Sequence, residues 1–243
     1  MLDPRLRRIE AAMERAVNEV RLLAAATPTN AVAERARLIA AAENGRPLVP
    51  MWTYAPPRRT DARPVLDATR EALDELGADP LAAVYRARVD EIAIEADLVA
   101  AVGTPSLATK AAARFAPFAE TTRRAAAVLR DEWVHADVRA DDDPAEIPTD
   151  SPDPNSLLSI LEREVGARGL PFRVRVHPAL SSLAATGDRI LLVAAGRAIT
   201  KRTALRTALH EIEGHALPRL RATERELGIF RLGTARGVDE QEG

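Results

Sequence analysis

Apolar residues in the first 135 positions recur every three to four residues, a period that favours helices and little else. Asp3 and Pro4 open the first such stretch as an N-cap and a first-turn residue. The segment 47–57 is expected to be non-helical, because its prolines lack the backbone donor that a helix needs. Residues 1–135 are therefore predicted to form a helical N-terminal portion. The expected helices after the first lie near residues 30–43, 62–76, 80–102, 105–115 and 118–131.

The composition changes at residues 136–155, which are rich in aspartate, glutamate and proline and are predicted to be an acidic linker. Beyond it, Phe172–His177 alternates apolar and polar residues, as a half-exposed strand does. Arg189–Ala195 is a short apolar run and is predicted to be a second strand. Thr200 is expected to cap a long helix. The predicted fold class is α+β and mainly helical, with a small sheet in the portion that follows the linker.

Composition excludes several classes of function. The chain has 34 Lys+Arg against 36 Asp+Glu and a formal net charge of −2, which argues against a protein that binds nucleic-acid phosphates. It has no cysteine, so any metal must be held by histidine and carboxylate. No run approaches the roughly 20 apolar residues of a membrane span, and the N-terminus lacks the features of a signal peptide. We expect a cytoplasmic protein without membrane or nucleic-acid partners.

Two of the four histidines fall in the segment His210-Glu211-Ile212-Glu213-Gly214-His215. The pattern His-Glu-x-x-x-His is one residue wider than the zincin motif. In a straight α-helix the two rings would lie about 140° apart and on different faces. A local π-turn returns the fifth residue to nearly the same face, and Pro218 already breaks the α-helical ladder there. We therefore predict a distorted helix in which both imidazoles face one metal ion.

The neighbouring residues suggest how such a site would work. Glu211 directly follows the first histidine, a position from which it would act as the general base that activates water. Two imidazoles leave zinc one protein ligand short, and a carboxylate from elsewhere in the chain normally completes a catalytic site. Asp239, Glu240 and Glu242 are the candidates. The alternative interpretation of the motif is a solvated face or a salt-bridge cluster without metal.

The order of these elements, with Gln241-Glu242-Gly243 at the end, resembles one known family. It is similar to the bacterial QEGLA-motif proteins, a family whose name refers to the modulation of flavohaemoglobin expression. The relatives of this family include the microtubule-associated tyrosine carboxypeptidases. The resemblance extends from about Phe172 to Gly243. It implies a zincin-like catalytic portion over residues 156–243.

The resemblance also implies a site and an activity. His210, His215 and Glu242 would be the zinc (Zn²⁺) ligands, and Glu211 would be the catalytic base. The implied function is a zinc metallocarboxypeptidase that removes a C-terminal aromatic residue from a protein or peptide. Because the Leu-Ala of the QEGLA motif is missing after Gly243, the catalytic portion is expected to be incomplete at its C-terminus. The alternative is a truncated, inactive helical protein that acts as a binding or regulatory module.

A carboxypeptidase also needs a cation that recognises the substrate's terminal carboxylate, and the bidentate geometry of arginine suits this role. Five arginines lie near the motif or in the segment that follows it, and the sequence does not choose among them. They are Arg197, Arg202, Arg206, Arg219 and Arg231. The natural substrate and the oligomeric state are likewise left open by the sequence.

Overall fold

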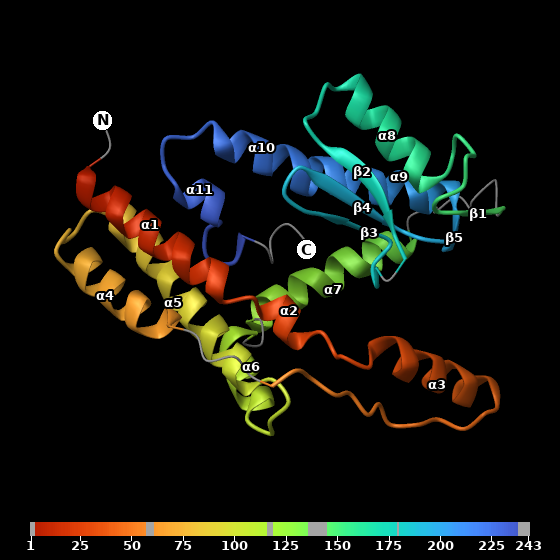
Figure 1. The fold of residues 1–243 in the computed structure, drawn as a ribbon, viewed down its shortest axis with the longest axis horizontal. Coiled ribbons are helices and arrows are strands. Elements are labelled where there is room, and N and C mark those ends of the chain that lie inside the picture. The colour runs from red at the N-terminus through yellow and green to blue at the C-terminus, as the bar shows by residue number, and fades with distance from the viewer. Residues whose placement is uncertain (1–2, 57–60, 116–118, 136–144, 179, 238–243) are drawn as a thin grey trace. The chain divides into compact units, whose positions relative to one another are not determined.

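A computed structural model describes residues 3–56, 61–115, 119–135, 145–178 and 180–237 of the chain (Figure 1). The chain divides into two compact units. Unit 1 comprises the described residues of 1–118 together with 225–237, and unit 2 comprises those of 119–224. The fold is α+β and mainly helical, as the sequence predicts.

Unit 1 is a set of helices, most of which pack around one apolar core. Its helices are α1 (Pro4–Glu19), α2 (Leu22–Ala26), α3 (Ala31–Glu43), α4 (Ala62–Asp74), α5 (Pro80–Ala101), α6 (Leu107–Arg114) and α11 (Ile229–Leu232). Of these, α1, α2, α4, α5 and α11 pack around the core. The Asp3 side chain accepts a hydrogen bond from the backbone N–H of Arg5 at 2.8 Å, which confirms the predicted cap of α1. Met13 of α1, Leu66 of α4 and Tyr85 of α5 are fully buried in the core, and this burial holds the three helices together.

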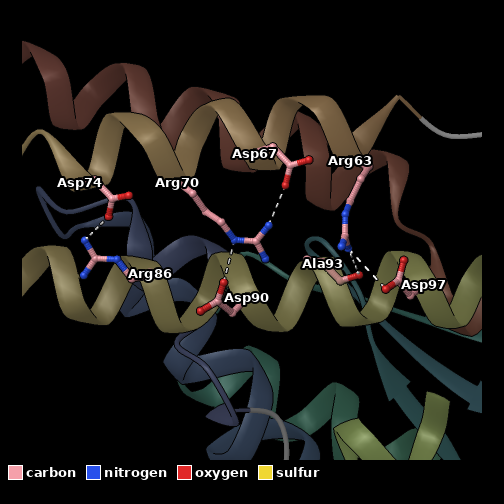
Figure 2. A network of polar contacts seen from close by, with 8 residues as sticks. All are labelled: Arg63, Asp67, Arg70, Asp74, Arg86, Asp90, Ala93 and Asp97. Carbon is pink, nitrogen blue, oxygen red and sulfur yellow. Dashed lines mark hydrogen bonds and ion pairs between the residues drawn. The ribbon is translucent and has the colours of Figure 1, made fainter. Parts of the chain in front are cut away.

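A row of ion pairs runs along the line where α4 and α5 lie side by side (Figure 2). Arg70 bonds Asp67 on its own helix and Asp90 on α5, each at 2.8 Å. Arg63–Asp97 and Arg86–Asp74 pair the two helices farther along in each direction, an arrangement that requires α4 and α5 to run antiparallel. Because these groups are partly exposed, each pair contributes at most about 1 kcal/mol.

A buried carboxylate joins the end of the chain to its beginning within unit 1. Glu10 of α1 accepts hydrogen bonds from the Tyr85 hydroxyl and from the backbone N–H of Gly228, which directly precedes α11. A Cβ at position 228 would lie 2.7 Å from the Glu10 carboxyl carbon, so a larger residue there would displace the Glu10 side chain. Ile229, 3% exposed, joins the core beside this contact. Residues 225–237 are therefore part of the helical unit and not of the unit that precedes them in the chain.

Unit 2 combines helices with two small sheets. Its elements are α7 (Glu120–His135), β1 (Glu146–Pro148), α8 (Leu157–Ala167), β2 (Arg173–His177), β3 (Ala184–Thr186), β4 (Ile190–Ala194), β5 (Ala198–Thr200), α9 (Lys201–Leu209), η1 (His210–Ala216) and α10 (Leu217–Thr223). The larger sheet has the order β2-β4-β3, with β2 parallel and β3 antiparallel to β4. Leu157 and Leu161 of α8 pack with Leu191 and Val193 of β4 in a second apolar core.

The predicted linker, residues 136–155, is only partly within the described residues. Its described end is folded: β1 pairs antiparallel with β5, with Ile147 opposite Ile199. Thr149 is fully buried and its hydroxyl donates to the carbonyl of Ala194. This acidic and proline-rich stretch therefore contributes a strand, β1, to the fold of unit 2.

Several other elements follow the sequence expectations. β2 and β4 occupy the two predicted strands, and the Thr200 hydroxyl caps α9 by accepting from the Thr203 N–H at 3.2 Å. Strands β3 and β5 were not expected, because three residues are too few to establish a period. Within the described ranges, no helix has the length and apolar character that crossing a membrane requires.

We predict that Glu10→Ala destabilises the protein by about 2–3 kcal/mol, because it leaves the Tyr85 hydroxyl and the Gly228 N–H buried without an acceptor. The control is Glu14→Ala, which removes an exposed carboxylate from the same helix and should change stability by less than about 0.5 kcal/mol. Urea unfolding monitored by circular dichroism measures both. Equal losses in the two variants would contradict the role of Glu10.

Candidate functional site

The site is built on one helical rod in which α9, η1 and α10 follow one another without interruption. Ala204, Ala208, Ile212 and Ala216 are buried along this rod and fix it to the unit 2 core. This buried stripe determines which side chains of the rod remain available for chemistry.

The rod changes from α to π geometry at the motif. Residues His210–Ala216 form the π-helix η1, and the N–H of Leu217 bonds the carbonyl of Ile212, five residues earlier. Pro218 follows at once and has no N–H to donate to the Gly214 carbonyl, so an α-helical ladder cannot continue through this turn. The helix distortion predicted from the sequence is thus confirmed.

The wider turn brings the two histidine rings together. Nε2 of His210 lies 3.0 Å from Nε2 of His215, and the rings meet edge to face with their centroids 4.7 Å apart. Two nitrogens that bind one zinc ion at about 2.0–2.1 Å and a tetrahedral angle are separated by roughly 3.3 Å. The pair therefore has the spacing and the chemistry of two ligands of one zinc ion.

Glu211 lies between the two histidines in sequence and turns toward the sheet. Its side chain is buried, with 6% of the residue exposed. The Thr186 hydroxyl, at the end of β3, donates to Glu211 Oε2 at 2.7 Å. The other oxygen, Oε1, accepts no hydrogen bond from any residue that the structure describes. The described residues therefore hold this carboxylate through one oxygen.

Glu213 serves a different purpose. It forms an ion pair with Arg168 at the end of α8, and this hydrogen bond raises the pKa of Arg168. Both side chains are substantially exposed, so the pair adds little stability but ties η1 to α8.

The third predicted ligand, Glu242, lies outside the described residues, as do Asp239 and Glu240. Within the described ranges, no group of three histidine, aspartate or glutamate side chains is arranged to hold a metal. The described part of the chain thus provides the two imidazoles and the adjacent carboxylate, but not a complete ligand set.

The five candidate arginines have different surroundings in the structure. Arg206, one turn before His210, lines a hollow of about 380 Å³ together with Thr203, Thr207 and His210. Arg197 instead donates to the carbonyl of Ser181, and Arg231 belongs to unit 1. Arg206 is therefore the candidate that shares a cavity with a proposed zinc ligand. Arg202 and Arg219 are exposed on the same rod.

Comparison with known proteins identifies the family. The family model described as microtubule-associated tyrosine carboxypeptidase matches residues 42–243, which is most of the chain. The chain belongs to this family. No curated protein and no solved structure matches it. Family membership supports a carboxypeptidase-like activity on a protein substrate, and the match includes η1 and the Gln241-Glu242-Gly243 segment.

Two residues of the site were not found from the sequence. Thr186 contacts Glu211 from 25 positions away, and Arg168 contacts Glu213 from 45 positions away. Neither residue belongs to a motif, since the two contacts form only when β3 packs against η1 and the end of α8 comes within reach of Glu213.

α1 lies outside the part of the chain that matches the family, although it carries much of the unit 1 core.

Proposed function

We propose that the protein is a zinc-dependent carboxypeptidase that removes a C-terminal aromatic residue, tyrosine or phenylalanine, from a protein or peptide. The observation that carries this proposal is the convergence of His210 Nε2 and His215 Nε2 within 3.0 Å beside a buried glutamate. Membership of the tyrosine carboxypeptidase family supports the reaction and the class of substrate.

His210 and His215 would hold the metal, with Glu242 as the third ligand. When bound, zinc supplies a Lewis acid that polarises the scissile carbonyl and makes water more acidic. The chain's own residues do the remaining work. Glu211 would accept the proton of the attacking water at Oε1 and then return it to the nitrogen of the leaving amino acid.

Two further residues would prepare the reactants. Thr186 holds Glu211 Oε2, which fixes the direction of the other oxygen. Arg206 would bind the substrate's terminal carboxylate in the hollow that it shares with His210, because a guanidinium binds a carboxylate through two parallel hydrogen bonds. This contact would restrict the activity to peptides with a free C-terminus.

We predict that the purified protein retains about one zinc ion per chain and releases tyrosine from a peptide with a free C-terminus but not from its amide. Glu211→Gln should keep the zinc and lower turnover by about 10²–10⁴-fold, the contribution typical of a general base. Zinc analysis and tyrosine release measure the two effects.

The matched control is Glu213→Gln, which makes the same chemical change two residues away at a side chain that pairs with Arg168. It should keep both zinc and activity. Full activity of Glu211→Gln would refute the base assignment. A wild-type chain that neither retains zinc nor cleaves either peptide would refute the proposed function and favour the inactive binding module.

For Thr186→Val we predict a roughly tenfold lower kcat with unchanged KM and zinc content, because the variant keeps the side chain's shape and loses the hydrogen bond to Glu211. Thr186→Ser retains the hydroxyl and should restore most of the rate. If the serine variant is as slow as the valine variant, Thr186 acts through packing and not through the hydrogen bond.

A further inference from the structure

Unit 1 contains a groove between α1 and α4 that the carboxypeptidase chemistry does not use. Its volume is about 530 Å³. Arg5, Arg8 and Arg15 line it from α1, and they follow one another on a single face of that helix. We refer to it as the α1–α4 groove.

The floor of the groove is apolar. It is formed by Ile9 and Ala12 of α1 and by Val65, Ala68 and Ala72 of α4. The small alanine side chains leave the space that the arginines surround. Glu75 is the one acidic residue in the lining, so the groove has an excess of positive charge.

The arginines of the groove differ from those of the neighbouring helices. All four arginines of α4 and α5, namely Arg63, Arg70, Arg86 and Arg88, are paired with carboxylates, and Figure 2 shows three of them. Arg5, Arg8 and Arg15 form no ion pair with any residue in the described ranges. Their charges are therefore available to a partner that supplies carboxylates.

We propose that the α1–α4 groove binds an acidic segment of a partner protein. Its carboxylates would pair with Arg5, Arg8 and Arg15, and an apolar side chain between them would cover the alanine floor. Nucleic acid fits the groove less well, because no aromatic side chain lines it for base stacking. The arginines lie outside the family match, so this proposal does not rest on the peptidase activity.

The test uses the full chain and a fluorescein-labelled peptide of repeating Glu-Glu-Leu units, with binding measured by fluorescence anisotropy. Arg8→Ala should weaken binding roughly tenfold, the effect expected from losing one charge-assisted hydrogen bond. The control is Arg7→Ala, which removes the same charge from the next residue of α1, outside the groove lining. It should weaken binding by less than about twofold.

A second pair of variants tests the floor without changing charge. Ala68→Leu fills the groove and should weaken binding, whereas Ala87→Leu at an exposed position of α5 should not. Absence of peptide binding, or equal effects of Arg7→Ala and Arg8→Ala, would overturn the proposal. Displacement of the peptide by a single-stranded oligonucleotide more effectively than by the unlabelled peptide would overturn the choice of an acidic protein segment.

Discussion

The π-turn at His210–Ala216 is the feature on which the candidate site depends. One extra residue in the turn changes the angular separation of the two histidines, so that ring nitrogens five positions apart come within 3.0 Å. A π-helix of this kind is less stable than an α-helix, and it persists here because Ile212 and Ala216 pack into the unit 2 core while Pro218 denies the α-helical alternative a donor. Packing and a missing hydrogen bond together impose the geometry that brings the two imidazoles together.

The rest of unit 2 orients what the π-turn presents. The Thr186 hydroxyl at the end of β3 bonds Glu211, and Arg168 at the end of α8 pairs with Glu213. Two glutamates separated by one residue therefore have different environments. The buried carboxylate, which the described residues hold through one oxygen, suits proton transfer, whereas the exposed and neutralised one serves as a link between elements. Residues 225–237, which lead toward Glu242, are anchored separately in unit 1 through Gly228 and Ile229.

The sequence predicts the features that are encoded locally. Apolar periodicity gives the helices, alternation gives β2, and the five-residue spacing with Pro218 gives the helix distortion. It does not predict contacts whose partners are distant along the chain. The β1–β5 pair joins a strand of the acidic, proline-rich stretch to residues about 50 positions later in the chain, and the Glu10–Gly228 bond spans 218 positions. No local pattern marks Thr186 as the partner of Glu211, because that contact exists only after the sheet packs on η1.

The proposed function depends on the two converging imidazoles, those of His210 and His215, binding one zinc ion. X-ray absorption at the zinc edge, recorded on the full chain loaded with one equivalent of zinc, tests it most directly. We expect scattering from about two imidazole rings at about 2.0–2.1 Å, falling to one ring in His215→Ala. A wild-type spectrum without imidazole scattering, or one that His215→Ala leaves unchanged, would contradict it.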